Sequence, residues 1–491
     1  MNFAEYQKDD SGIFNPIKAS AIPFAYSDGD EIEERIYKTI RSAKDVSLAS
    51  DELQRSIKDW PSEYHLTPLR ANLLSFLHLA KFSKILEIGS GCGAITRQLG
   101  EKGRDIVALE GSYRRALITK SRCRDLDNVN VVCDSFERLS IADRFDLVTM
   151  IGVLEYSPMF FADLNPVERA LARVNELLGD EGVAVFAIEN QLGLKYFNGC
   201  AEDHTGQLFD GLNNFYEANN IVTFGKKELT RLLLNSGFEN LEFIYPFPDY
   251  KLPRLLIRDQ ALQDKDLLVG QIIGQFESKD YVQNQERFLM ENRVWPVIEK
   301  NGLVPDLSNS FLIIAFKGEN RMHELTDSWL MRSFSGARKK KYLTVNRFHK
   351  QNGSLLVEKK RSFENSLLTE ESEINRKVKH ITGISGFIQG KPYNSILPFK
   401  LFVGEPVEQY IEYLKPWIQF LDNVAKTAVN KTDLEKGLLP GEYLDCRPDN
   451  IIIGKENELI YFDREWEVHE LLQIGFIIFR GILHDIINHQ Y

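Results

Sequence analysis

Three glycines and two carboxylates in the first third of the chain have the types and spacing of a nucleotide-type binding site. Gly89, Gly91 and Gly93 follow a short apolar stretch, and glycine lets a backbone turn sharply and approach a ligand closely. Glu110 lies 17 residues after Gly93, where a carboxylate can accept hydrogen bonds from both hydroxyls of a ribose. Asp134 lies further along and can accept from an adenine amine. These residues predict a pocket for a cofactor that contains adenosine.

Two kinds of adenosine cofactor fit this pattern. The G-x-G-x-x-A run at residues 89–94 satisfies the dinucleotide-binding motif, and Glu110 follows it at a suitable distance. Glu87 inside the preceding strand, the crowding of the loop by Gly93, and Asp134 favour a sulfonium amino acid instead. Such a cofactor has no pyrophosphate that needs a helix N-terminus. S-adenosylmethionine is therefore the favoured cofactor, and a nicotinamide oxidoreductase is the alternative.

Strands that alternate with helices position these residues. This alternation predicts a parallel, doubly wound α/β sheet, and open sheets of this kind bind ligands at the carboxyl ends of their strands. Two later strands are expected after a helix at 226–235. The strands predicted from short apolar runs are 85–88, 105–109, 129–133, 145–151, 183–188, 241–245 and 311–316.

The motif residues resemble those of class I S-adenosylmethionine-dependent methyltransferases over about residues 60–318. The resemblance rests on the glycine loop with Glu87, on Glu110, on Asp134 and on the Gly-Val-Leu-Glu-Tyr stretch at 152–156. It implies a Rossmann-like sheet with an antiparallel last strand. It also implies that Glu87 and the loop hold the methionine part, Glu110 the ribose and Asp134 the adenine. The residues expected to bind the cofactor are Glu87, Gly89, Ser90, Gly91, Cys92, Gly93, Glu110, Gly111, Asp134, Ser135, Phe136, Ile151 and Gly152.

Methyl transfer needs an aligned acceptor and, for a hydroxyl acceptor, a group that removes its proton. Asp203 and His204 are adjacent in the chain, and an acid next to an imidazole is a candidate base. Asp249 and Tyr64 are expected to line other sides of the acceptor site. The resemblance supplies no base, because Ser157-Pro158 stand in a loop that more commonly contains a histidine.

The last third of the chain resembles a protein-kinase-like fold. Asp445 and Asn450 lie five residues apart, and Asp463 follows a predicted strand pair, as in kinase catalytic loops. The resemblance implies ATP with Mg²⁺ on Asn450 and Asp463, Asp445 near the acceptor hydroxyl, Lys360 on the phosphates and Glu371 as its partner. The loop lacks the usual His-Arg before the acid, and the expected glycine-rich segment has one glycine. An active kinase and a scaffold therefore both remain open.

The composition shifts along the chain predict three parts. Residues 1–80 are expected to form a helical lid or substrate segment, and residues 81–318 the methyltransferase domain with an insertion at 246–310. The chain becomes polar and loses its periodicity near 317–327. After that boundary, residues 328–491 are expected to form a smaller α+β, kinase-like domain.

The overall composition excludes several classes of protein. With 43% hydrophobic residues and 27% charged residues, the chain can bury large cores. A net charge of -11 argues against a protein that grips a nucleic-acid backbone. The five cysteines lack metal-ligand spacing, the N-terminus does not read as a signal peptide, and the apolar stretch 471–483 is too short to cross a bilayer. We therefore expect a cytoplasmic protein without a transmembrane segment.

A methyltransferase joined to a kinase-like module resembles the bifunctional enzymes that cap bacterial O-antigen polysaccharides. The resemblance implies a saccharide hydroxyl or a sugar phosphate as the acceptor, and other polysaccharide-synthesis enzymes as partners at the inner membrane. A non-catalytic assembly subunit is a further alternative. The sequence does not determine the acceptor or the oligomeric state.

Overall fold

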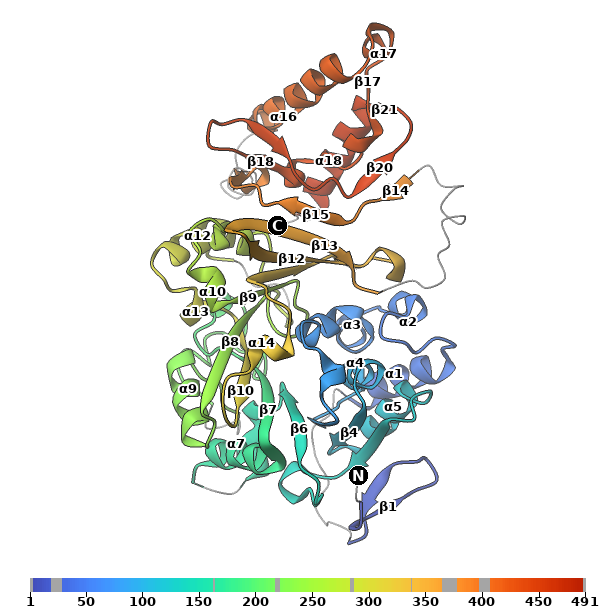
Figure 1. Ribbon diagram of the computed structural model, residues 1–491, viewed down its shortest axis with the longest axis vertical. Helices are drawn as coiled ribbons and strands as arrows, with labels where there is room; N and C mark the ends of the chain where they lie inside the picture. The colour runs from blue at the N-terminus through green and yellow to red at the C-terminus, as the bar shows by residue number, and fades with distance from the viewer. Residues whose placement is uncertain are drawn as a thin grey trace. The chain divides into compact units, whose positions relative to one another are not determined.

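Figure 1 shows a computed structural model of the protein. It describes residues 3–18, 29–161, 164–216, 221–282, 287–336, 338–363, 378–396 and 407–488. The chain divides into two compact units. The first unit comprises Met1–Asp259, Ser278–Phe288 and Leu303–Lys340, and the second unit comprises Gln260–Glu277, Leu289–Gly302 and Lys341–Tyr491.

The first unit is built on a sheet whose central strands are parallel. The order is β5-β4-β3-β6-β7, followed by β10 and then β8. β10 pairs antiparallel with both β7 and β8, so among these seven strands β10 alone runs in the opposite direction. The expected Rossmann-like sheet with an antiparallel last strand is confirmed. These strands are β3 (Lys84–Ile88), β4 (Asp105–Glu110), β5 (Val129–Cys133), β6 (Phe145–Ile151), β7 (Leu178–Glu189), β8 (Asn240–Phe247) and β10 (Ser310–Phe316).

The strand order reverses between β3 and β6, and this reversal positions the site. β3 pairs with β4 on one side and with β6 on the other, all in parallel. Loops that leave the carboxyl ends of β3 and β6 therefore diverge and leave a crevice between them. Most residues of the central strands are apolar and buried, and every residue of β10 is below 2% exposed, so the sheet is a rigid support for that crevice.

The helices of the first unit follow the strands as the alternation predicts. β3 leads into α4 and β4 into α5, while α7 precedes β7 and α9 precedes β8. Pro166 lies in the first turn of α7, where proline is compatible with a helix. These helices are α4 (Ala94–Lys102), α5 (Tyr113–Arg122), α6 (Ser157–Phe160), α7 (Pro166–Leu177), α8 (Leu194–Phe197) and α9 (Lys226–Asn235).

The N-terminal segment is helical from residue 30 onward, but it begins with a hairpin that the pattern does not predict. β1 (Tyr6–Lys8) pairs with β2 (Phe14–Pro16), and β2 joins the edge of β5. Both strands have three residues, which is too short for a periodic signal. The helices are α1 (Asp30–Ser42), α2 (Asp51–Arg55), α3 (Trp60–Leu66) and the 3₁₀ turns η1 (Pro68–Leu74) and η2 (Leu79–Lys81).

The segment 246–310 contains its own secondary structure and contributes to both units. Its first-unit part continues the sheet, because β9 pairs antiparallel with β8 and with β11. The elements that follow β8 are β9 (Leu255–Arg258), α10 (Asp259–Leu262), α11 (Val269–Ile273), α12 (Glu291–Lys300), α13 (Val304–Leu307), α14 (Met322–Leu325) and β11 (Met331–Phe334).

The second unit contains an antiparallel sheet in the order β12-β13-β15. The turn between β12 and β13 is formed by Asn352 and Gly353, whose φ values are 51° and 79°, as in tight two-residue hairpins. The strands of the sheet are β12 (Thr344–Gln351), β13 (Ser354–Arg361) and β15 (Gly383–Gly386).

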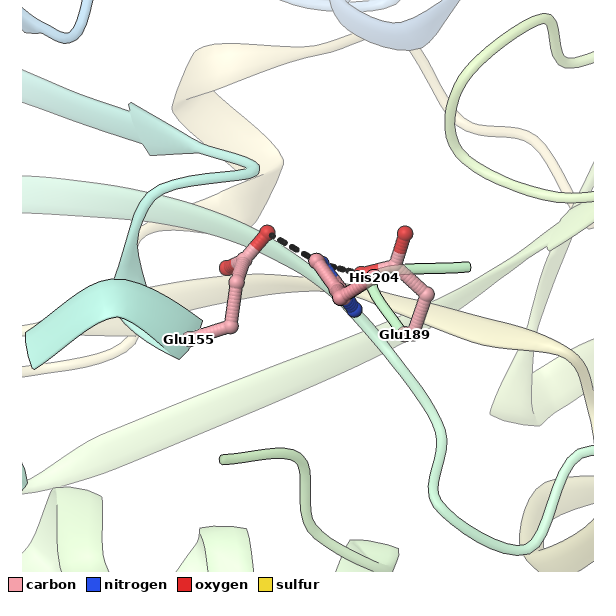
Figure 2. A group of neighbouring side chains, drawn as sticks. All are labelled: Glu155, Glu189 and His204. Atoms are coloured by element: carbon pink, nitrogen blue, oxygen red, sulfur yellow. Dashed lines mark ion pairs between the residues drawn. The ribbon is translucent and has the colours of Figure 1, made fainter. Parts of the chain in front are cut away.

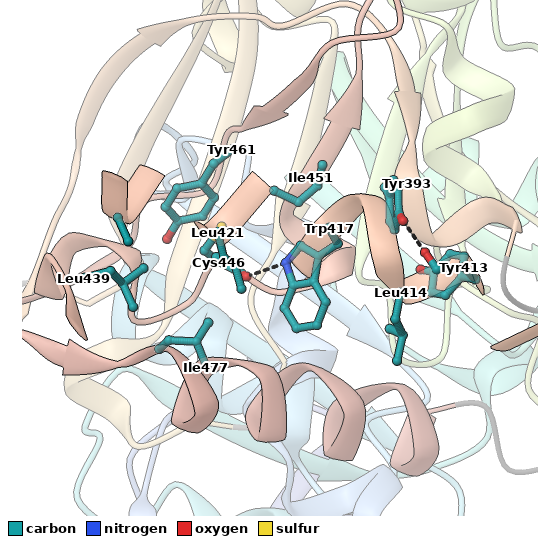
Figure 3. Packing of buried hydrophobic residues seen from close by; sticks show 11 residues of the cluster. Tyr393, Tyr413, Leu414, Trp417, Leu421, Leu439, Cys446, Ile451, Tyr461 and Ile477 are labelled. Carbon is teal, nitrogen blue, oxygen red and sulfur yellow. Dashed lines mark hydrogen bonds between the residues drawn. The ribbon is translucent and has the colours of Figure 1, made fainter. Parts of the chain in front are cut away.

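Two longer helices and several short strands complete the second unit. The core lies around Trp417, whose indole N–H donates to the carbonyl oxygen of Cys446 at 3.0 Å (Figure 3). The unit is α+β as expected, while its kinase-like character stays a prediction. Its remaining elements are β14 (Val378–His380), β16 (Lys391–Pro392), α16 (Val407–Ala428), α17 (Lys431–Glu435), β17 (Leu438–Leu439), β18 (Ile451–Ile453), β19 (Leu459–Tyr461), β20 (Trp466–Val468), β21 (Leu472–Gln473) and α18 (Ile474–Asn488).

None of the helices in the described part of the chain combines the length and the apolar character needed to span a membrane.

Candidate active site

The glycine loop between β3 and α4 forms one wall of a pocket. Gly89, Gly91 and Gly93 have φ values of 78°, 56° and 81°, a region that favours glycine because side chains clash there. A side chain on Gly89 would also lie 2.4 Å from Cγ2 of Val153, which belongs to the loop after β6. The glycines therefore allow two loops to approach each other at the point where the strand order reverses.

The three predicted carboxylates lie on neighbouring strands. Glu87 is in β3, Glu110 ends β4, and Asp134 follows β5 directly. Glu110 accepts hydrogen bonds from the backbone N–H groups of Gly91 at 2.7 Å and Ser112 at 3.0 Å, which orients it beside the glycine loop. Since β3, β4 and β5 are parallel, these side chains meet at one edge of the sheet.

Hydrogen bonds and burial set the properties of these acids. Thr96 donates to Oε2 of Glu87 at 2.5 Å, and the Tyr6 hydroxyl from the N-terminal hairpin donates to Oδ2 of Asp134 at 2.8 Å. Burial raises the pKa of Glu87 to about 8 and also raises the pKa of Glu110. A positively charged ligand beside them would favour their ionised forms.

The structure brings the predicted cofactor residues together. Twelve of the thirteen line the pocket, and Gly93 lies at the start of α4 next to it. Tyr64, which is predicted for the acceptor side, lines the same pocket. The twelve are Glu87, Gly89, Ser90, Gly91, Cys92, Glu110, Gly111, Asp134, Ser135, Phe136, Ile151 and Gly152.

Several lining residues are missing from the sequence prediction. Arg70 lines the pocket, and its guanidinium lies 3.9 Å from the centroid of the Tyr64 ring. Tyr156 and Phe160 come from the segment after β6. Tyr156 is the last residue of the stretch 152–156, on which the family resemblance rests, so the sequence offered a reason to include it among the pocket residues. Arg70 precedes the first strand of the parallel sheet, and no local pattern identifies it.

A charged cluster lies beside the pocket, at the ends of β6, β7 and β8. Its members are buried: Glu155 and Glu189 are 1% and 0% exposed, and Asp249 is 1% exposed. Tyr156 connects the cluster to the pocket, because it lines the pocket and its ring packs edge-on against the imidazole of His204 at 5.5 Å. The charged cluster consists of Glu155, Glu189, Lys195, Glu202, Asp203, His204, Asp249 and Lys251.

The expected pairing of Asp203 with His204 does not form. Nδ1 of His204 lies 2.9 Å from Oε1 of Glu202 instead, and Asp203 accepts from the ammonium groups of Lys195 at 2.5 Å and Lys251 at 2.8 Å. The loop explains the exchange, because the backbone N–H groups of His204 and Thr205 both donate to Oε2 of Glu202 at 2.7 Å. This turn directs Glu202, and not Asp203, toward the imidazole.

A comparison with families of known proteins identifies the fold around the pocket. Residues 86–184 match the family model Methyltransf_12, described as a methyltransferase domain. This stretch of the chain is similar to a methyltransferase domain. The match covers the glycine loop, Glu110, Asp134 and Glu155. The nicotinamide alternative is therefore not favoured. No curated protein matches the chain.

Solved structures of methyltransferases resemble the chain at low identity. N-methyltransferase NodS from Bradyrhizobium japonicum is 15% identical over 51% of this chain and 94% of its own, with a TM-score of 0.30. A possible histamine N-methyltransferase from Thermotoga maritima is 15% identical over 59% and 92%, with a TM-score of 0.28. Phosphoethanolamine N-methyltransferase 2 from Haemonchus contortus is 17% identical over 51% and 53%, with a TM-score of 0.31. Scores this low establish neither the substrate nor the reaction of this chain.

The surroundings of His204 disfavour its predicted role as a base. Burial disfavours the charged imidazole, but the carboxylates of Glu189, Glu155 and Glu202 outweigh burial and raise the pKa of His204 well above its usual value. An imidazolium ion has no lone pair with which to accept a proton. The assignment of the base therefore stays a prediction. Asp249, which is predicted to line the acceptor site, accepts a hydrogen bond from the Tyr281 hydroxyl at 2.6 Å.

In the second unit, three of the predicted kinase-like residues, Asp445, Asn450 and Asp463, lie close together. Asn450 donates to the carbonyl oxygen of Asp445 at 2.8 Å, and the backbone N–H of Phe462 donates to the carbonyl oxygen of Asn450 at 3.2 Å. Asp463 follows directly, and its carboxylate contacts the ammonium group of Lys359.

The lysine that contacts Asp463 is Lys359, whereas the sequence analysis assigns the neighbouring Lys360 to the phosphates of ATP. Lys360 is 61% exposed and pairs with Glu358 at 2.8 Å. Successive side chains of a strand point to opposite faces, so Lys359 and Lys360 of β13 cannot both face Asp463. Glu371, the predicted partner of the lysine, lies outside the described residues.

Proposed function

We propose that the chain is an S-adenosylmethionine-dependent methyltransferase. The observation that carries the proposal is the pocket at the reversal of the strand order, where the glycine loop meets Glu87, Glu110 and Asp134. The residues fit the cofactor, because buried acids suit its cationic methionine part and the Glu110 carboxylate suits a ribose diol. Bound there, S-adenosylmethionine would supply a methyl group activated by its positive sulfur.

The residues of the chain then have to align an acceptor with that methyl group. Transfer is an in-line displacement, so the acceptor has to lie opposite the sulfur. The β6 and β7 side of the crevice, with Tyr156 and the charged cluster, is the place we assign to the acceptor. The new bond forms between the acceptor oxygen and the methyl carbon as the carbon–sulfur bond breaks, and the hydroxyl proton leaves to a base.

We propose a saccharide hydroxyl or a sugar phosphate as the acceptor. Half-buried aromatic rings support this class: Tyr64 lines the pocket, and Trp60 lies 5.5 Å from Tyr64 and 4.0 Å from Tyr281 between ring centroids. Flat aromatic faces pack well against the C–H faces of sugar rings, while their polar ends can reach hydroxyls. Arg70 beside Tyr64 could hold a phosphate.

Transfer of a tritiated methyl group from S-adenosylmethionine to a panel of glycans and sugar phosphates tests this proposal. We expect label on at least one saccharide oxygen with the wild-type chain and a strong loss with Glu110→Ala. Glu34→Ala on the exposed surface of α1 is the matched control and should transfer at the wild-type rate. Label that appears only on amines would contradict the saccharide acceptor.

The second unit supports a second candidate function, a kinase-like module that works with the methyltransferase domain in polysaccharide synthesis. The observation that favours it is the contact of Lys359 with Asp463, next to the loop that holds Asp445 and Asn450. In such a module Asn450 and Asp463 would hold Mg²⁺ and Lys359 the phosphates of ATP. Transfer of labelled phosphate from ATP to the same glycan panel separates a kinase from a scaffold, because a scaffold transfers none.

A further inference from the structure

Three side chains of the charged cluster have the geometry of metal ligands. Glu155, Glu189 and His204 each present one ligand atom, and these atoms lie within 4.8 Å of one another (Figure 2). Nε2 of His204 is 3.6 Å from Oε1 of Glu155 and 3.8 Å from Oε2 of Glu189. These separations exceed hydrogen-bond lengths. They are close to the roughly 3.4 Å between two ligands of a tetrahedral ion with bonds of about 2.1 Å.

Two buried oxygens at this position lack a hydrogen bond. Oε2 of Glu155 and Oε2 of Glu189 have no hydrogen-bond partner among the described residues, and both side chains are at least nine-tenths buried. The other oxygen of Glu189 contacts the Lys251 ammonium group, which leaves Oε2 directed toward His204. A buried carboxylate oxygen without a partner is costly, and a bound cation would satisfy it.

Glu202 supplies the support that a metal-binding histidine requires. It lies 2.9 Å from Nδ1 of His204, and backbone N–H groups hold its second oxygen in place. A proton on Nδ1 would be shared with this carboxylate, which leaves the lone pair of Nε2 for an ion. Metal-binding histidines are commonly oriented by a carboxylate in this manner.

The charge of the cluster also favours a divalent cation. Five carboxylates face two ammonium groups and one imidazole, so even a protonated imidazole leaves two negative charges in excess. A divalent ion beside a neutral imidazole would reduce the excess to one. Buried charges are stable only when they are paired or coordinate a metal.

We propose that Glu155, Glu189 and His204 bind one divalent first-row transition-metal ion. A set of one imidazole nitrogen and two carboxylate oxygens suits Mn²⁺, Fe²⁺ or Zn²⁺ better than Mg²⁺ or Ca²⁺. The ion would link the end of β7, the turn after β6 and the loop of His204. It would lie next to Tyr156, whose ring packs against the imidazole of His204. In this arrangement His204 is a ligand, and the base of the methyl-transfer reaction is another group.

Metal binding to the full chain tests the site. The chain is stripped with a chelator and titrated with Mn²⁺ or Zn²⁺ by calorimetry, and the Co²⁺-loaded chain is examined by visible absorption. We expect one ion per chain and the absorption of a Co²⁺ ion bound to nitrogen and oxygen. Glu189→Gln, Glu155→Gln and His204→Gln should each raise the Kd for the ion by at least about tenfold.

Asp249→Asn is the matched control, because Asp249 is a buried acid of the same cluster that is not a ligand. Its Kd for the ion should rise less than in any of the three ligand variants, whereas an equal loss in all variants would show unspecific attraction and overturn the site. A wild-type chain that binds none of the three ions would also overturn it. Binding of S-adenosylhomocysteine is measured in parallel, so a failed metal site with intact cofactor binding leaves the proposed methyltransferase function standing.

Discussion

Glu110 is the residue on which the cofactor assignment depends most directly. It ends β4, it is buried, and it accepts from two backbone N–H groups beside the glycine loop. Its position therefore combines two tasks, which are to hold the loop and to present a carboxylate to a ribose. A substitution at this residue should affect the cofactor before it affects any acceptor.

We predict that Glu110→Ala lowers the affinity for S-adenosylhomocysteine by about 10- to 150-fold, the equivalent of one lost charged hydrogen bond of about 1.5–3 kcal/mol. Calorimetric titration measures this affinity, and the exposed change Glu34→Ala should leave it unaltered. Binding of NAD together with no binding of S-adenosylmethionine or its demethylated product would overturn the cofactor assignment.

Glu87 should make stability depend on pH. Burial raises the pKa of Glu87 in the folded chain to about 8, whereas the same side chain in the unfolded chain ionises near pH 4.5. Between these two pH values the folded state therefore binds more protons than the unfolded state. The contribution of Glu87 to the free energy of unfolding is therefore fully present below about pH 4.5. It falls as the pH rises toward 8, by at most about 1.4 kcal/mol per pH unit.

The variant Glu87→Gln removes that titration, so its free energy of unfolding should fall less steeply between pH 5 and 8 than that of wild type. Denaturant unfolding at several pH values measures the two slopes, and Glu34→Gln serves as the control. Parallel slopes for wild type and Glu87→Gln would show that Glu87 is already ionised in the folded chain.

At the level of secondary-structure elements, the core of the second unit depends on the close packing of α16 against α18. Trp417 of α16 is fully buried, and a side chain on Gly481 of α18 would lie 2.4 Å from its ring. Gly481 thus allows the two helices to approach each other, and the indole can reach the carbonyl oxygen of Cys446 (Figure 3).

We predict that Gly481→Ala destabilises the chain by about 1–3 kcal/mol, the usual cost of an overfilled core. Gly475→Ala on the same helix is the matched control, since no atom lies within 4 Å of the added carbon. That change should be neutral or stabilising by up to about 1 kcal/mol, because alanine favours helix more than glycine does. Denaturant unfolding of the full chain distinguishes the two, and equal stabilities would contradict the close packing.

At the scale of the whole molecule, the question is whether both units bind a nucleotide-type ligand. If the second unit binds ATP with Mg²⁺ through Lys359, Asn450 and Asp463, the ligand should stabilise the chain by about 2.7 kcal/mol at a hundredfold excess over its Kd. The effect should require Mg²⁺ and should disappear in Asp463→Asn.

Thermal unfolding with and without a non-hydrolysable ATP analogue measures this effect. Asp422→Asn, an exposed acid on α16 that pairs with Lys426, is the control and should keep the response. No shift with any nucleotide at millimolar concentration would leave the second unit as a scaffold, and the chain as a methyltransferase alone.

The central strands of the sheet, the glycine loop and the carboxylates beside it could be predicted from the sequence. Strands such as β5 and β6 begin and end where the apolar runs do, since a strand buried on both faces consists of a continuous apolar run. The ends of parallel strands meet at one edge, so the order of Glu87, Glu110 and Asp134 along the chain was enough to place them together. Local conformation and the parallel sheet that alternating strands and helices imply are sufficient for this prediction.

The contacts between side chains of distant segments could not be predicted from the sequence and are seen in the folded chain. In the fold, His204 pairs with Glu202, and Glu155 and Glu189 lie near the other nitrogen of its ring. Lys359 contacts Asp463. The fold also brings Arg70 to the pocket. These contacts depend on the rotation of a loop or on the face of a strand, where a shift of one residue reverses the direction of a side chain. Spacing along the chain does not contain that information, because it arises from the packing of whole elements.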